Sequence, residues 1–271
     1  MMIGKRYICI ALAALALTVV ATEARAQHTL ALTGGYGMTT ARFYPNQETK
    51  ALWSAWSGGL SWRYYSERPR FVGGFGIDLE WMQRGYSYAP YASLYEDKKE
   101  YKYYTRRLNS IMLPIVWQPH FYLFKHHVRV YLEAAVTFSY NFSSTFRNDE
   151  TGTSGKYSFR TVRDNRFGYG LAGGGGIDFL IKQVEIGFRV RYDFGFSDIL
   201  RNRNKYYDNS LDQVRKPGEN PFWYTPLRSP LDNLTMSIKV GFRFNKAGFR
   251  EWNVKRTPRK KNEEVFKFSL D

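Results

Sequence analysis

Cysteine is almost absent from this chain. The 271 residues contain one cysteine, Cys9, which lies in an N-terminal segment that we expect to be removed. The mature chain would then have no disulfide and no thiol chemistry. Histidine is also scarce, with four residues, although it is the side chain that most often does acid–base work near neutral pH. No Ser-His-Asp arrangement suggests itself either, so the sequence predicts a protein that is not an enzyme and has no cofactor.

Long hydrophobic runs are missing after the N-terminus. A short basic start precedes an apolar stretch, residues 7–20, which is too short to read as a spanning helix, and Ala24-Arg25-Ala26 follows with the small-x-small pattern of a cleavage site. Residues 1–26 are therefore predicted to be a secretory signal peptide, with an uncleaved anchor as the alternative. An exported chain without a second apolar run of this kind is not expected to cross a membrane by helices.

Negative charge is in short supply. Lysine and arginine number 40 against 24 acidic residues, a net charge of +16, and removal of the predicted signal peptide leaves +14. A basic chain that is 18% aromatic suggests single-stranded nucleic acid as one partner, but export argues against nucleic acid. We expect the positive charge to face anionic lipid headgroups, lipopolysaccharide phosphates or an acidic protein.

The chain is rich in strict alternation. From residue 128 to residue 142, every second residue beginning with Val128 is apolar or aromatic, and the residues between them include Arg129 and Glu133. A period of two puts successive side chains on opposite faces of a strand. Strands of soluble proteins usually have ~5–6 residues, whereas ~9–11 cross a bilayer at a tilt. The pattern therefore predicts a membrane-spanning β-barrel with lipid outside and a polar lumen.

The alternation recurs in eight segments, and the connections between them alternate in length. The predicted strands cover residues 28–38, 55–65, 71–84, 108–118, 128–142, 167–181, 184–196 and 234–244. The first, third, fifth and seventh connections are long, as expected of external loops, and the others are short, as expected of periplasmic turns. We predict an all-β fold, an eight-stranded antiparallel up-and-down transmembrane β-barrel over residues 27–246. It would lie in the outer membrane of a Gram-negative bacterium with both termini periplasmic.

The short connection Lys182-Gln183 allows a prediction of register. A two-residue turn pairs the residues that flank it. Within the glycine run 173–176, this places Gly176 opposite Arg189 and Gly174 opposite Arg191 on the inner face, and Gly173 opposite Tyr192 on the outer face. Two explanations of the glycines stay open. They leave lumen volume for the guanidinium groups, or they permit sharp curvature of the wall.

The inner faces of the predicted strands carry charges of both signs. The predicted network consists of Arg63, Asp78, Glu80, Arg129, Glu133, Asp178, Arg189, Arg191, Asp193, Lys239 and Arg243, with Arg84 and Glu185 also in the lumen. For Glu133, the candidate partners are Arg189, Arg191 and Lys239. An eight-stranded barrel is just wide enough for side chains to fill it, and buried charges are rare unless paired. We therefore expect a salt-bridged plug, with a proton or ion path as the alternative.

Three further groups of residues are candidates for binding. His120, His126 and His127 flank one short turn, and a polar interfacial turn explains them better than a metal site does, so no metal is predicted. Aromatic and basic residues of the long loops suggest an external interface, with solvated loops as the alternative. The candidates are Tyr88, Tyr91, Tyr95, Arg201, Arg203, Trp223 and Tyr224.

The last segment, residues 247–271, is predicted to be a basic periplasmic tail. It contains a basic run and then an alternating apolar stretch that could add to or pack on another protein, with a disordered tether as the alternative. The candidate periplasmic interface consists of Arg259, Lys260, Lys261, Phe266 and Phe268.

Three short stretches resemble a known family, the PorT-like outer-membrane β-barrels of Bacteroidota, over residues 27–246. The stretches are Gly34-Gly35-Tyr36-Gly37, Leu113-Pro114-Ile115-Val116 and Tyr131-Leu132-Glu133-Ala134. Some members of that family are components of the type IX secretion and gliding machinery, and others accompany larger outer-membrane assemblies. The resemblance implies a non-catalytic scaffold or accessory subunit of a secretion or barrel-assembly complex, with other outer-membrane or periplasmic proteins as partners. The alternative is a stand-alone envelope barrel that binds surface ligands or lipopolysaccharide, or a narrow solute porin.

Overall fold

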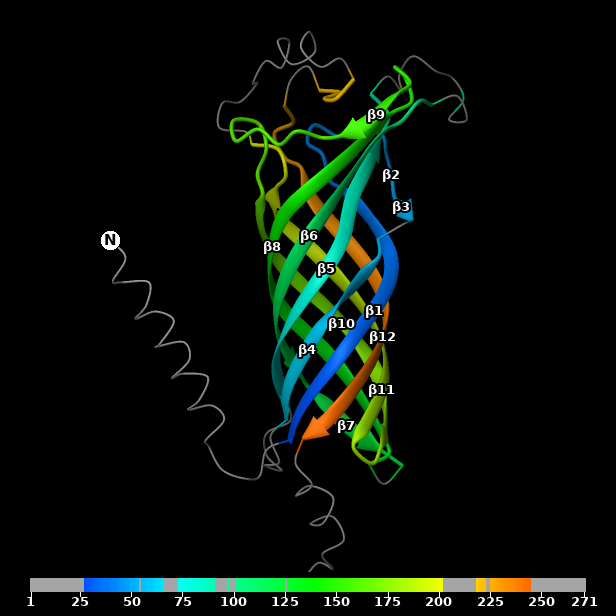
Figure 1. The fold of residues 1–271 in the computed structure, drawn as a ribbon, viewed down its shortest axis with the longest axis vertical. Helices are drawn as coiled ribbons and strands as arrows, with labels where there is room; N and C mark the ends of the chain where they lie inside the picture. Colours follow the sequence, from blue (N-terminus) through cyan, green and yellow to red (C-terminus); the bar gives the residue numbers. More distant parts are fainter. Residues whose placement is uncertain are drawn as a thin grey trace, which may run out of the picture. The chain divides into compact units, whose positions relative to one another are not determined.

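Eight long antiparallel strands pair side by side into a closed ring (Figure 1). In chain order they are β1 (Gln27–Ala41), β4 (Ser57–Tyr65), β5 (Gly74–Tyr88), β6 (Tyr104–Gln118), β8 (Val128–Asn148), β10 (Phe167–Ile181), β11 (Val184–Asp198) and β12 (Pro230–Phe244). Each strand pairs with the next long strand, and β12 pairs with β1 to close the ring. The predicted eight-stranded up-and-down barrel is confirmed.

The structure is a computed structural model. The residues that it describes are 27–53, 55–65, 73–90, 97, 101–124, 126–201, 218–222 and 225–244. The predicted signal peptide and the predicted tail, with Arg259, Lys260, Lys261, Phe266 and Phe268, lie outside the described residues and stay predictions.

The two ends of the barrel differ in the connections that they carry. Residues 42–56, 89–103, 149–166 and 199–229 connect strands at one end, here called the loop end, while residues 66–73, 119–127 and 182–183 connect them at the other, the turn end. This confirms the predicted alternation of long and short connections. Four short strands extend the sheet at the two ends: β2 (Thr49–Lys50), β3 (Leu52–Trp53), β7 (His120–Leu123) and β9 (Thr153–Lys156).

The predicted register at the Lys182-Gln183 turn is confirmed. Ile181 pairs with Val184, and two residues of the glycine run lie opposite Arg189 and Arg191. The period-two pattern and the tight turn were sufficient to fix this pairing, because a slip by one residue would turn every apolar side chain of the hairpin into the lumen.

Close packing between neighbouring strands explains the glycine run. A Cβ built on Gly174 or Gly176 would collide with a carbonyl oxygen of β11, and on Gly176 it would also come within 2.7 Å of the Tyr131 ring. The neighbours that exclude a side chain are thus backbone and a tyrosine rather than the guanidinium groups. Close approach of wall strands is the explanation that the structure favours.

An apolar band surrounds the barrel. Large apolar side chains point outward and are exposed on every long strand, for example Phe75, Ile77, Leu79 and Trp81 on β5 and Ile111, Leu113, Ile115 and Trp117 on β6. A continuous apolar surface of this extent is not tolerated in water, and it is what lipid requires of a barrel. No helix within the described part of the chain is long and apolar enough to cross a membrane.

The strands reach further toward the loop end than the alternation predicts. β8 continues to Asn148 rather than ending at Phe142, and the outward residues of its extension, Thr145 and Arg147, are polar. The backbone ladder therefore continues after the apolar pattern has ended. At Phe142 the pairing with β6 shifts by one residue, which reverses the inward and outward phase of β8 as a bulge does.

Candidate functional site

Six charged side chains form the main ionic layer of the lumen. This central cluster consists of Arg63, Asp78, Glu80, Glu133, Arg189 and Arg191, all buried, from strands β4, β5, β8 and β11. Its three cations and three carboxylates balance in charge. Because every member is paired, the cluster satisfies the condition under which charges are tolerated in a low-dielectric interior.

Bridging by arginine holds the central cluster together. Arg191 donates to Glu133, to Asp78 (Nη2 to Oδ2, 2.7 Å) and to Glu80. Arg189 contacts the same two carboxylates of β5, with Nη2 2.6 Å from Glu80 Oε1 and Nη1 3.1 Å from Asp78 Oδ2. Arg63 donates to Asp78 from the neighbouring strand. Since β11 and β5 are not adjacent in the ring, the two arginines of β11 tie opposite walls together across the lumen.

A second, smaller ionic layer lies nearer the turn end. This turn-end cluster consists of Arg129, Asp178, Glu185 and Lys239 and is also balanced in charge. Arg129 Nη2 is 2.6 Å from Asp178 Oδ2 and 2.8 Å from Glu185 Oε2, and Lys239 Nζ is 2.9 and 3.1 Å from the same two carboxylates. The Arg129 guanidinium also lies 4.0 Å from the centre of the Tyr65 ring.

Not every predicted luminal residue joins a cluster. Asp193 is buried and accepts no hydrogen bond from the described residues, and with Arg84 it lines a cavity of about 10 Å³, which is about the space that one water molecule needs. Arg243 instead donates to the carbonyl oxygen of Lys182 in the turn.

Of the three partners predicted for Glu133, Arg191 is confirmed, whereas Arg189 pairs with Asp78 and Glu80 instead and the link to Lys239 is wrong. Glu133 pairs with Arg191 and, at 3.9 Å, with Arg63, whereas Lys239 belongs to the turn-end cluster. The stagger of neighbouring strands around the barrel sets the height of each side chain, and the sequence pattern does not reveal that stagger.

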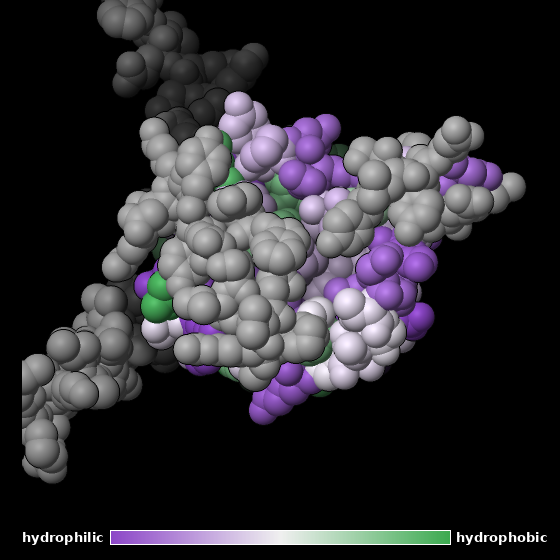
Figure 2. Space-filling view, turned by 90° about the horizontal axis from the view of Figure 1, so that it is seen from above, coloured by the Kyte–Doolittle hydropathy of each residue, from purple (hydrophilic) through white to green (hydrophobic). Residues whose placement is uncertain are grey.

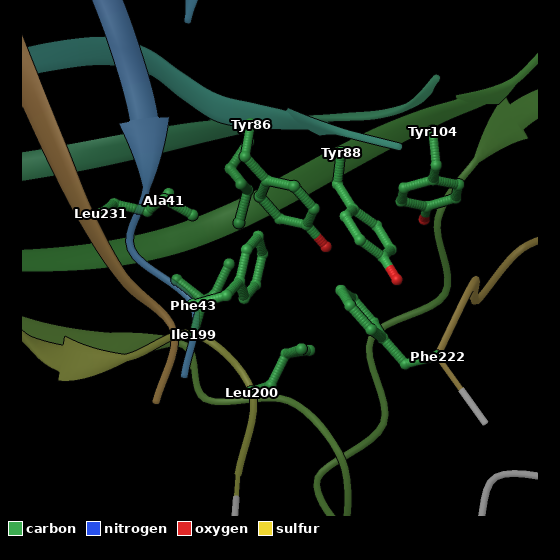
Figure 3. Close-up of a cluster of buried hydrophobic side chains, with 10 residues drawn as sticks. Ala41, Phe43, Tyr86, Tyr88, Tyr104, Ile199, Leu200, Phe222 and Leu231 are labelled. Atoms are coloured by element: carbon green, nitrogen blue, oxygen red, sulfur yellow. The ribbon is translucent and has the colours of Figure 1, made fainter. Parts of the chain in front are cut away.

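A cluster of buried aromatic rings, here called the aromatic cap, lies at the loop end (Figure 3). It consists of Phe43, Tyr86, Tyr88, Tyr104 and Phe222, all buried. Tyr88 and Phe222 stack with ring centres 4.9 Å apart, and Phe43 meets Tyr86 edge-on at 5.1 Å. Phe222 comes from the long connection between β11 and β12, so part of that connection packs into the mouth of the barrel.

A buried ion pair stands beside the aromatic cap. Arg106 Nη2 is 3.1 Å from Asp164 Oδ1, and the Arg106 guanidinium lies 3.5 Å from the centre of the Tyr157 ring. Tyr157 donates its hydroxyl to the same carboxylate oxygen, at 2.9 Å. Burial raises the pKa of Tyr157, so the phenol stays neutral and acts as a donor. These contacts fix the connection between β9 and β10 over the lumen.

Two predicted external residues are described, and neither lies freely exposed. Tyr88 is 6% exposed, which corrects its assignment to an external interface: its ring belongs to the buried cluster and stacks on Phe222. Arg201 is half-buried, and its backbone N–H donates to the carbonyl oxygen of Arg163. The other candidates lie outside the described residues: Tyr91, Tyr95, Arg203, Trp223 and Tyr224.

The histidines of the turn end make ring contacts. His120 lies 5.0 Å from the Tyr65 ring and 5.2 Å from the Tyr122 ring, and His126 lies 4.9 Å from Tyr122. Among the residues that the structure describes, no three His, Cys, Asp or Glu side chains are grouped as a metal site requires.

The sequence contained a signal for the aromatic cap. Tyr86 and Tyr88 keep the same period-two phase as Glu80 on β5, and Tyr104 and Arg106 keep the phase of the buried residues of β6. Extending the strand pattern beyond the last apolar outward residue would have placed all four inside the barrel. Phe222 and Asp164 have no such signal, because they lie in connections without periodicity.

A family model described as outer membrane protein beta-barrel domain matches residues 25–201. Among solved structures, a major outer membrane protein from Thermus thermophilus is 13% identical, with a TM-score of 0.46 over 81% of this chain and 99% of that chain. The N-terminal β-barrel domain of Pseudomonas aeruginosa OprF is 11% identical (TM-score 0.36, 80% and 97%). Ail, the attachment invasion locus protein of Yersinia pestis, is 14% identical (TM-score 0.34, 82% and 100%). The comparison with curated proteins found no match.

Proposed function

This chain belongs to the family of outer membrane protein beta-barrel domains, and from that premise we propose that it acts through its surfaces rather than through its lumen. Such a family implies the outer membrane of a Gram-negative bacterium. Within it, we propose a non-catalytic scaffold or accessory subunit of a larger outer-membrane complex, of the secretion or barrel-assembly type. The resemblance to PorT-like barrels of Bacteroidota supports this role. The loop end would face outward and both termini would be periplasmic.

The filled lumen is the observation that carries the proposal. Two charge-balanced clusters and an aromatic cap occupy successive levels between the turn end and the loop end. A solute or ion would have to separate buried pairs, each of which costs ~3–5 kcal/mol to break. A barrel that transports nothing through its interior is left with its lipid-facing surface, its ends and its partners as places to act.

Co-purification tests the scaffold role. The full chain, tagged and extracted in a mild detergent, is expected to migrate with partner proteins in fixed stoichiometry. A variant that ends after residue 246 is expected to lose those periplasmic partners while keeping the heat-modifiable gel mobility of a folded barrel. A monodisperse monomer from the full chain would contradict the scaffold role.

A stand-alone barrel that binds surface ligands or lipopolysaccharide is the second candidate. One observation favours it: Lys50, Arg107 and Arg147 are exposed and line a groove at the loop end. A narrow solute porin, the third possibility, is opposed by the filled lumen. Outer-membrane lipid and lipopolysaccharide are proposed partners in either case.

A further inference from the structure

A groove of about 590 Å³ lies at the loop end, on the outward face of the barrel wall. Its floor is a row of residues that pair across four neighbouring strands. Lys50 of β2 pairs with Ser87 of β5, Ser87 with Thr105 of β6, and Thr105 with Arg147 of β8. One rung below, Arg107 pairs with Thr145. The sheet thus aligns cations and hydroxyl groups in two adjacent rows, and we call this surface the outer groove.

The outer groove carries an excess of positive charge. Lys50, Arg107 and Arg147 are exposed, against one carboxylate, Asp149, which pairs with Arg147 at 2.7 Å. Within the described part of the chain, no ion pair involves Lys50 or Arg107. The local net charge of +2 suits a dianion, and an arginine offers a phosphate two parallel N–H donors. Figure 2 shows hydrophilic side chains of the described residues gathered around this end of the barrel.

The remaining lining suits a sugar. Trp53 is 65% exposed at the rim, and Tyr103 lies with its ring 5.8 Å from Lys50 Nζ. Thr105 and Ser87 place hydroxyl groups 3.0 Å apart on the floor. A pyranose ring has an apolar C–H face that packs on an aromatic ring and a rim of hydroxyls that exchange hydrogen bonds. Cations, aromatic rings and hydroxyls together therefore match a phosphorylated sugar better than a bare phosphate.

The height of the outer groove above the apolar band points to a lipid. Arg107 stands four residues beyond Ile111, the last large apolar side chain on the outward face of β6. At ~3.4 Å per residue and a tilt of ~45°, Arg107 is roughly 10 Å beyond the edge of the hydrocarbon. That height is just above a headgroup layer of ~5–8 Å on each side of the core, where only a headgroup larger than that of a simple phospholipid would extend. A ligand anchored in the outer leaflet would present its headgroup at this level.

We propose that the outer groove binds the phosphorylated sugar headgroup of an outer-leaflet glycolipid, with Arg107 and Arg147 on the phosphate and Trp53 against the sugar ring. The glycolipid would sit against the outer side of β5, β6 and β8, with its acyl chains along the apolar band below. This inference rests on the proposed outward placement of the loop end, and it does not depend on the scaffold role.

Native mass spectrometry of the full chain in detergent, with lipid A as the probe, tests the inference. Wild-type protein is expected to retain one lipid A per barrel, and Arg107→Ser with Arg147→Ser is expected to weaken binding at least tenfold. Lys102→Ser with Lys156→Ser is the matched control, because it removes two exposed loop-end cations that do not line the groove. The control is expected to bind within about twofold of wild type. Heat-modifiable gel mobility checks that each variant is folded.

Two further measurements distinguish a membrane lipid from a free sugar phosphate as the ligand. Dephosphorylated lipid A is expected to bind at least tenfold more weakly than lipid A. Soluble glucosamine 1-phosphate is expected not to displace lipid A at equal concentration. Unchanged binding by the Arg107/Arg147 variant, or equal binding of the dephosphorylated lipid, would overturn the site. Equal competition by the soluble sugar phosphate would overturn the assignment to a membrane lipid. None of these arms involves partner proteins, so their failure is distinct from failure of the scaffold role.

Discussion

Replacing Arg189 with alanine removes a cation that holds two carboxylates of the opposite wall. In the folded barrel Arg189 is buried and donates to Glu80 at 2.6 Å, to Asp78 at 3.1 Å and to Ser237 at 3.0 Å. Asp78 keeps Arg63 and Arg191 as partners after the substitution. Among the described residues, Glu80 then keeps Arg191 alone, at 3.3 Å, so Glu80 becomes the undercompensated charge.

The expected cost follows from that geometry. Removing one partner of a buried pair costs ~3–5 kcal/mol, because it leaves a desolvated charge without compensation. We expect Arg189→Ala to lower the free energy of unfolding by about 3 kcal/mol, near the lower bound, since Arg191 still contacts Glu80. The measurement is the urea midpoint of the barrel refolded into phospholipid vesicles, together with the gel mobility shift on heating.

A double-mutant cycle separates the ion pair from the loss of packing. Arg189→Met keeps much of the side-chain volume, and Glu80→Gln removes the opposing charge, so the double variant is expected to be more stable than the sum of the single effects by at least ~1 kcal/mol. Lys156→Ala, at an exposed position of β9, should stay within about 0.5 kcal/mol of wild type. An Arg189→Ala barrel with an unchanged urea midpoint would refute the paired plug.

Three other substitutions probe the wall and the cap. Gly187→Val would drive a Cβ into the Asp178 carboxylate, so we expect little folded barrel on gels. Gly34→Ala is the control, because a Cβ there meets no atom within 4 Å, and it should fold normally. Equal yields of the two folded barrels would contradict the close packing. Phe222→Ala removes a buried ring and should lower the free energy of opening the loop end by about 3 kcal/mol. Limited proteolysis should then be roughly a hundredfold faster, and an unchanged rate would argue against the cap. Because burial raises the pKa of Tyr157, its stabilisation is present below the unfolded pKa near 10 and is lost only as the pH rises through the raised value. Tyr157→Phe should therefore leave the phenolate absorbance gained near pH 10 unchanged, and a loss of one tyrosine's absorbance there would contradict the burial.

The transmembrane part of the barrel was predictable because lipid imposes a simple rule. Residues 128–142 alternate strictly, and the two-residue turn after Ile181 fixes the pairing of β10 with β11. The same rule fails above the membrane, where the outward side chains of β8 become polar and the bulge at Phe142 reverses the phase. The apolar pattern therefore could not predict where the strands end at the loop end.

The charged residues of the lumen were identifiable, but their partners were not. Alternation places Glu133, Arg191 and Lys239 on inner faces, yet the stagger between strands decides that Glu133 pairs with Arg191 and that Lys239 lies in a different layer. The contacts of Phe222 and Asp164 depend on the way in which the long connections fold back on the barrel. Neither residue lies in a periodic pattern, so the sequence gives no sign of these contacts.

Planar-bilayer recording of the wild-type barrel tests the sealed lumen most directly. With both ionic clusters paired and the aromatic cap in place, purified protein inserted into a bilayer is expected to give no steady single-channel conductance under applied voltage. Long-lived, ohmic current steps from the wild-type protein would contradict a lumen closed by paired charges and aromatic rings.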